Sequence, residues 1–157
     1  MINMKHESYF LLLLAFMVGI VSVARAAESS NALASASALA ASDELAKVEQ
    51  QWGIKFSGLF LSAGGNMVDF RYKVLDPQKA ALLTKPELKP MLSDQTTGAK
   101  LEVPTSPKTG PMRQTTKLPV TGKIYFMLFA NTRHHVKSGD KVTITAGDFK
   151  MENLLVE

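Results

Sequence analysis

The sequence contains no cysteine. This absence excludes disulfide bonds, thiolate catalysis, iron–sulfur clusters, covalent haem attachment and zinc sites built on thiolate ligands. It also excludes a lipid anchor on an N-terminal cysteine. Whatever fold the 157 residues adopt must therefore be held together by its hydrophobic core.

Recognisable catalytic motifs are missing as well. There is no G-x-S-x-G, no H-E-x-x-H and no P-loop, and the Gly64-Gly65 pair is too short for a dinucleotide fingerprint. Ser138, His135 and Asp140 can be combined into a triad on paper, but such residues occur in almost every chain. We therefore predict that the chain is not an enzyme and binds no cofactor, with copper as the single exception.

Long runs of like charge are also absent. Lysine and arginine number 18 against 14 acidic residues, which gives a net charge of +4, and the basic residues are scattered. A nucleic-acid partner is not predicted, because such partners select clustered basic residues. With 46% hydrophobic and 20% charged residues, the composition fits one globular domain.

The N-terminus has the pattern of a secretory signal peptide. The run from Tyr9 to Val21 is apolar throughout, Lys5 and His6 precede it, and Ala24-Arg25-Ala26 follows it. An uncleaved membrane anchor is the alternative, but the run is shorter than the roughly 20 residues that cross a bilayer. We predict a signal peptide over residues 1–26, a periplasmic or secreted protein, and no membrane insertion after cleavage.

An Ala/Ser-rich segment, residues 27–42, follows and is predicted to be a linker, because it has too few apolar side chains to order itself. A short helix is expected over residues 43–51. Leu45, Val48 and Trp52 would form a narrow apolar stripe on it. Trp52 is expected to pack against the core, with stacking on a sugar or partner as the alternative.

Two strands and a Gly-rich turn are predicted between Ile54 and Leu75. The first strand has a break in its alternation at Ser57-Gly58, where we expect a bulge. In the second strand, Val68, Phe70, Tyr72 and Val74 alternate with Met67, Asp69, Arg71 and Lys73. This period of two predicts one apolar and one polar face.

The later chain also favours short strands. Residues 88–94 and 99–103 are predicted to form a hairpin, and the Pro/Gly-rich span 104–122 is expected to hold a short edge strand at 113–118. In total, about seven strands with little helix predict a mainly β domain over residues 43–157. Its expected form is an antiparallel β-sandwich, immunoglobulin-like, with a small closed barrel as the alternative.

One predicted strand, residues 123–131, is apolar on both faces. Ile124, Phe126, Leu128 and Ala130 face one way, and Tyr125, Met127 and Phe129 face the other. A strand of this kind is expected to be a central strand covered on both sides, or a strand whose second side is buried by the linker helix or by a partner.

Two stretches, Met67–Pro77 and Tyr125–Asn131, resemble uncharacterised exported proteins of bacteria, and the likeness extends over roughly residues 53–157. The resemblance implies a bacterial, exported, single-domain β protein. It implies no activity.

Four residues are candidates for ligand binding. Asp69 and Arg71 lie two positions apart on the polar face of one strand and are expected to pair with each other or with a neighbouring strand. Arg71, Arg113 and Arg133 would form an anion site if the fold brings them together.

Four other residues are candidates for metal binding. His134 and His135 lie in a predicted loop, and thioethers such as those of Met67 and Met112 suit copper(I). The alternatives are an exposed histidine pair and methionines that fill gaps in the core.

These observations lead to two hypotheses. The first is an exported, non-enzymatic β-sandwich that acts as an accessory or assembly module by binding an unidentified periplasmic or envelope protein. The second is a periplasmic protein that handles copper or zinc through histidine and methionine ligands.

Overall fold

The computed structural model describes residue 39 and residues 42–157 of the chain. The predicted signal peptide, residues 1–26, lies outside the described residues, as does most of the predicted linker, residues 27–42. Residues 43–157 form one compact unit. No helix among the described residues has the length and apolar character needed to cross a membrane.

A helix precedes the first strand, as predicted. Residues 43–52 are helical, and so are the described linker residues 39 and 42, so the helix begins earlier than expected. Trp52, at its end, is 8% exposed, and its ring packs edge-on against Phe149 with centroids 5.3 Å apart. The prediction that Trp52 packs against the core is confirmed.

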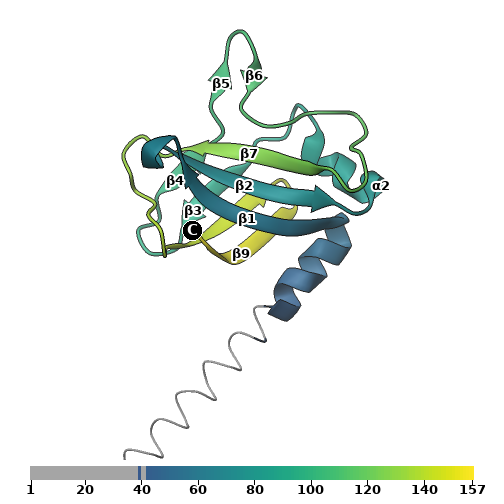
Figure 1. Ribbon diagram of the computed structural model, residues 1–157, viewed down its shortest axis with the longest axis horizontal. Helices are drawn as coiled ribbons and strands as arrows, with labels where there is room; N and C mark the ends of the chain where they lie inside the picture. The colour runs from purple at the N-terminus through teal and green to yellow at the C-terminus, as the bar shows by residue number, and fades with distance from the viewer. Residues whose placement is uncertain (1–38, 40–41) are drawn as a thin grey trace, which may run out of the picture. The chain divides into compact units, whose positions relative to one another are not determined.

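The described residues otherwise form mainly antiparallel β-structure (Figure 1). The sheets have the strand orders β1-β2-β7, β4-β3-β8-β9 and β5-β6. Three short helical segments, η1 (Ala63–Gly65), α2 (Pro77–Ala80) and η2 (Ala81–Thr84), connect β1 to β2 and β2 to β3. The strands are β1 (Ile54–Ser62), β2 (Met67–Val74), β3 (Met91–Asp94), β4 (Lys100–Glu102), β5 (Thr105–Ser106), β6 (Gly110–Pro111), β7 (Ile124–Ala130), β8 (Lys141–Ala146) and β9 (Phe149–Leu155).

Local sequence explains where several elements begin and bend. The register between β1 and β2 shifts between Phe56 and Gly58, which is the predicted bulge. α2 begins at Pro77 because Asp76 caps it: one carboxylate oxygen of Asp76 accepts a hydrogen bond from the backbone N–H of Gln78 at 2.9 Å. The predicted hairpin before residue 104 is present as β3 and β4.

The span 104–122 differs from the prediction. The expected edge strand at 113–118 is wrong, since only one isolated bridge forms there, between Arg113 and Met127. Beyond this bridge the N–H of Phe126 donates to the side-chain Oε1 of Gln114 at 3.2 Å, and the N–H of Thr116 donates to the carbonyl of Thr84 at 3.1 Å, so no ladder with β7 continues. The small ribbon β5-β6 was not predicted, and it brings the strands of the described region to nine.

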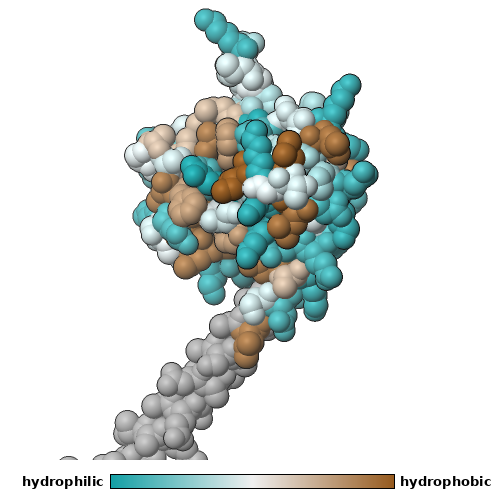
Figure 2. All heavy atoms as spheres, turned by 45° about the vertical axis from the view of Figure 1, so that its right-hand side comes forward, coloured by the Kyte–Doolittle hydropathy of each residue, from teal (hydrophilic) through white to brown (hydrophobic). Residues whose placement is uncertain are grey.

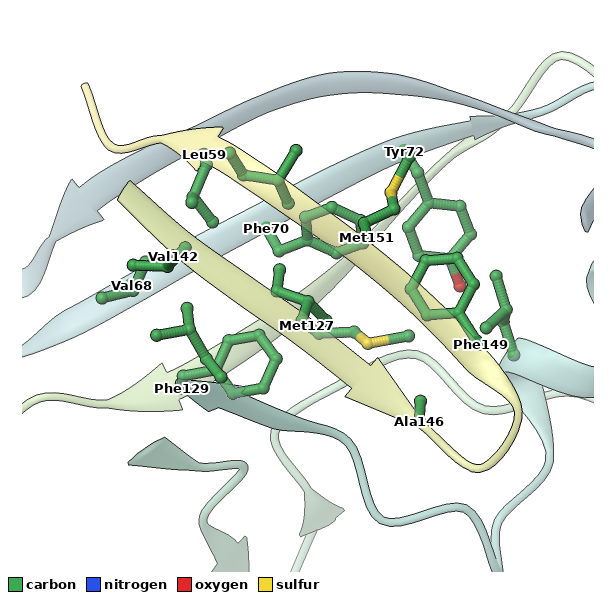
Figure 3. Packing of buried hydrophobic residues seen from close by; sticks show 14 of the residues in the cluster. Leu59, Val68, Phe70, Tyr72, Met127, Phe129, Val142, Ala146, Phe149 and Met151 are labelled. Carbon is green, nitrogen blue, oxygen red and sulfur yellow. The ribbon is translucent and has the colours of Figure 1, made fainter. Parts of the chain in front are cut away.

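One hydrophobic core unites the two larger sheets. Figure 3 shows aromatic and methionine side chains from β2 and β7 packing against side chains from β8 and β9. Phe70 and Tyr72 lie tilted at 5.6 Å between centroids, and Tyr72 stacks on Tyr125 at 6.0 Å. Burial of these large rings supplies most of the stabilisation that a chain without disulfides needs.

Both lateral edges of the β1-β2-β7 sheet carry backbone hydrogen bonds. On β1, the N–H of Leu61 donates to the carbonyl of Glu157 at 3.0 Å. On β7, the N–H of Leu128 donates to the carbonyl of Met112 at 3.0 Å. A partner strand adding to this sheet would have to displace these bonds, so the face of the sheet is more open to partners than its edges.

Candidate functional site

The solvent-facing side of the β1-β2-β7 sheet gathers four of the eight residues that the sequence nominates. We call this side the outer face. Its strand register aligns Phe60 with Asp69 and Leu128 in one row, and Arg71 with Phe126 in the next. Met67 and Met112 lie on the same side, opposite Ala130 and beside Leu128 respectively.

The predicted two faces of β2 are confirmed. Val68, Phe70, Tyr72 and Val74 have no exposed surface, whereas Arg71 and Lys73 are exposed. Asp69 departs from the pattern, because it points outward and yet is only 6% exposed. The outer face therefore contains a buried carboxylate, that of Asp69, among its apolar side chains.

On β7 the apolar character continues onto the outer face. Phe126, Leu128 and Ala130 are half-buried, and Ile124 is 53% exposed, whereas Tyr125, Met127 and Phe129 on the inward side are buried. The described residues thus bury one side of β7 and leave the other partly open. The sequence suggested that the linker helix or a partner would cover this side of β7. Within the described residues, the linker helix does not bury it.

Asp69 and Arg71 form an ion pair with each other, which is the first of the two arrangements expected from the sequence. Nε and Nη2 of Arg71 both donate to Oδ2 of Asp69, at 2.9 and 2.7 Å. This hydrogen bond, and then the charge of Asp69, raise the pKa of Arg71 above its ordinary value. The other oxygen, Oδ1, is buried without a hydrogen-bond partner. A buried carboxylate oxygen without a donor is costly, so Asp69 retains an unused acceptor at the centre of the outer face.

The ring of Phe60 takes its position from Gly58. A Cβ atom at Gly58 would lie 2.1 Å from Cζ of Phe60, so the ring lies directly over the glycine. The guanidinium of Arg71 lies 5.9 Å from the centroid of the same ring. Glycine in the bulge therefore makes room for an aromatic side chain that supports the ion pair from one side.

Arg113 lies on the opposite side of the sheet from Arg71. It is 5% exposed, and its guanidinium donates to the backbone carbonyls of Leu83, Lys85, Pro86 and Leu88. Burial lowers the pKa of Arg113, and the nearby Tyr72 and Glu87 partly offset this effect. The three arginines are not brought together, because Arg71 faces outward, Arg113 faces inward and Arg133 lies in an exposed loop.

An open groove of about 490 Å³ lies next to Arg113. Its walls are the proline-rich segment 86–90, the adjoining ends of β3 and β4, and the ribbon β5-β6. Glu87 and Glu102 balance Lys89 and Arg113 along the lining, so the groove has no net charge that selects one kind of ligand.

The histidines lie in a loop that Asn131 closes at its base. Nδ2 of Asn131 donates to the carbonyls of Gly65 at 2.9 Å and Val136 at 2.7 Å, and the N–H of Val136 donates to Oδ1 of Asn131 at 3.1 Å. Asn131 has no exposed surface, whereas residues 132–135 are exposed. The loop is thus fixed at its two ends and open to solvent between them.

Within this loop His134 has a positive φ of 50°, so the two histidines do not follow an extended backbone. Among the described residues, no group of three or more His, Cys, Asp and Glu side chains has a metal-holding arrangement. Met67 and Met112 lie on the outer face on either side of β7, about 10 Å apart across the strands and about 7 Å apart along them. Metal binding by these four residues stays a prediction.

The sequence contained a signal for part of the outer face. The two-sided apolar pattern of residues 123–131 pointed to Phe126 and Leu128. Phe60 was not among the candidates, although the bulge predicted at Ser57-Gly58 sets which residues of β1 face outward.

Comparisons with protein-family models, with curated proteins and with solved structures found no match to this chain. Its function must therefore be inferred from the geometry of its own surface.

Proposed function

We propose that this chain is an exported, non-enzymatic accessory module of the periplasm or extracellular space, and that it binds a partner protein through the outer face. The observation that carries the proposal is the half-exposed apolar side of β7 around Phe126 and Leu128, beside the unpartnered Oδ1 of Asp69. The outward side of an antiparallel sheet is ordinarily polar, so an apolar one marks a surface that another molecule covers.

The chemistry of the outer face suits a protein partner. Phe60 and Phe126 supply aromatic area, and rings at the centre of an interface contribute most to binding. Arg71 is 53% exposed through its side chain, so its remaining N–H groups are available to a partner carboxylate.

We also infer that the domain is an immunoglobulin-like β-sandwich. With β5 and β6 left out, the seven remaining strands can be lettered A to G in chain order. The two sheets then have the strand orders A-B-E and D-C-F-G. The constant-type immunoglobulin order is A-B-E-D in one sheet and C-F-G in the other. Moving D, the fourth strand, to the edge beside C gives the order seen in this domain. The single core between the two sheets also supports this inference.

A capture experiment with matched variants tests the partner proposal. The tagged wild-type chain and the double variant Phe126→Ser, Leu128→Ser are expressed at equal levels and recovered from envelope and medium after cross-linking in intact cells. We expect at least one protein to be enriched with the wild type and lost with the double variant.

Leu155→Ser is the control, because Leu155 is an exposed leucine that lies on β9, in the other sheet. It is expected to retain the partner. If no protein distinguishes the wild type from the double variant while both remain folded by urea denaturation, the outer face is not the binding surface and the proposal fails.

A further inference from the structure

A second apolar surface lies at one end of the domain, where it adjoins the outer face at Ile124 and does not include Phe60, Phe126 or Leu128. The end of β2, the segment α2-η2 and the start of β7 meet there (Figure 1). Eight large hydrophobic residues are exposed in the described part of the chain, and five of them come from the segments 73–85 and 116–124. These five are Leu75 (50% exposed), Leu82 (47%), Leu118 (59%), Val120 (59%) and Ile124 (53%).

Backbone hydrogen bonds hold the two segments side by side. The N–H of Val74 donates to the carbonyl of Lys123 at 3.0 Å, and the N–H of Gly122 donates to the carbonyl of Val74 at 2.7 Å. Farther along, the hydroxyl of Thr84 donates to the carbonyl of Thr116 at 2.9 Å. The two segments that carry the exposed aliphatic side chains are therefore adjacent, and we call the region that they form the aliphatic end.

Lysine is the dominant charged residue of the same two segments. They contain five lysines, Lys73, Lys79, Lys85, Lys117 and Lys123, against one acid, Asp76. Asp76 is already engaged as the cap of α2, and Lys79 donates to the carbonyl of Gln50 at 3.1 Å. Figure 2, which brings this side of the domain forward, shows hydrophobic side chains at the surface between hydrophilic ones.

We propose that the aliphatic end docks on the surface of a membrane that contains anionic lipids. Its aliphatic side chains would enter the boundary between headgroups and acyl chains, and its lysines would lie at the level of the phosphates. The charge is complementary, because anionic lipids attract basic residues that lie close to the bilayer surface. The domain would rest on the membrane without crossing it.

The composition of the aliphatic end favours a lipid surface over a protein. Protein interfaces are centred on Trp, Tyr and Arg side chains that fill pockets. The five exposed side chains are aliphatic and the basic residues are all lysine, and none of these ten residues lines the groove beside Arg113. Separate aliphatic side chains and flexible lysines match the fluid headgroup layer of a membrane better than they match the fixed shape of a protein surface.

Vesicle sedimentation tests the proposal, with the protein in the form that its host exports. The probes are vesicles of phosphatidylethanolamine with phosphatidylglycerol, and vesicles of phosphatidylcholine alone. We expect binding to the anionic vesicles, little binding to the neutral ones, and loss of binding at high salt, because salt screens the lysines. Leu118→Ser with Val120→Ser, and separately Lys117→Gln with Lys123→Gln, should each weaken binding about tenfold.

Two control variants sit elsewhere on the domain. Leu155→Ser removes an equally exposed aliphatic side chain from β9, and Lys108→Gln removes a lysine from the turn between β5 and β6. Both should bind the vesicles as the wild type does. Urea denaturation establishes that the variants are folded, and the test variants leave Phe126 and Leu128 intact, so partner capture through the outer face can be scored independently.

The proposal is overturned if the wild type does not bind anionic vesicles, in which case an acidic protein is the better occupant of the aliphatic end. It is equally overturned if the paired variants bind as well as the controls, or if neutral vesicles bind the wild type as strongly as anionic ones.

Discussion

Replacement of Arg113 by methionine should strongly destabilise the domain. Arg113 is 5% exposed, and two of its nitrogens donate to four backbone carbonyls of residues 83–88. Methionine keeps most of the packing of the side-chain stem but removes every donor. The four carbonyls would then have to find water through the adjacent groove.

The magnitude follows from the bonds that are lost. Hydrogen bonds to a charged group contribute about 1.5–3 kcal/mol each, and water entering the groove replaces some of them. Two well-formed bonds, lost without replacement, correspond to about 3–6 kcal/mol, which is a large share of the stability of a domain this size. In urea this loss lowers the midpoint of unfolding by about 2 M.

Urea denaturation and amide exchange measure the effect. Arg133→Met is the control, because Arg133 is exposed in a loop, and it should change the free energy of unfolding by less than about 0.5 kcal/mol. The amide of Leu88, which donates to the carbonyl of Lys85 at 3.2 Å, should exchange faster in Arg113→Met. A loss below about 1 kcal/mol would refute the view that Arg113 stabilises segment 83–88, and would return it to the candidates for ligand binding.

Two further predictions concern a close contact and an acid titration. Gly53→Ala should cost about 2 kcal/mol more than Gly98→Ala: both glycines have positive φ, but only at Gly53 would the new Cβ lie 2.6 Å from Cβ of Asp76. Equal losses in urea would mean that the chain relaxes around the contact. Burial of Asp94 acts to raise its pKa, but hydrogen bonds from Thr97 and from neighbouring amides outweigh burial and lower it. The corresponding stability is fully present above about pH 4, the ordinary pKa of aspartate, and is lost as pH falls through the lower folded pKa. Asp94→Asn should flatten this acid dependence, and parallel acid unfolding of variant and wild type would contradict the assignment.

Periodicity was sufficient to predict the elements that local sequence determines. The alternation from Val68 to Val74 gives the inward side of β2, because side chains alternate strictly along an extended chain. The cap at Asp76 and the proline after it likewise set the start of α2. Each of these features depends on residues close together in the chain.

Features set by long-range pairing could not be predicted. Arg113 faces inward because a single bridge to Met127 fixes its side of the sheet, and nothing near residue 113 encodes that bridge. The sequence therefore nominated Asp69 and Arg71 correctly as a pair, but it could not tell that Arg113 binds the backbone of its own domain.

The closure of the loop by Asn131 has a practical consequence. The carbonyls of Gly65 and Val136 are joined through one buried amide, so residues 132–135 are outside the framework that holds the strands in place. A peptide epitope or a fluorescent probe inserted after Thr132 should be tolerated there, since exposed loop tips accept insertions. Such a label would report on the protein in living cells and would leave both chain ends unmodified.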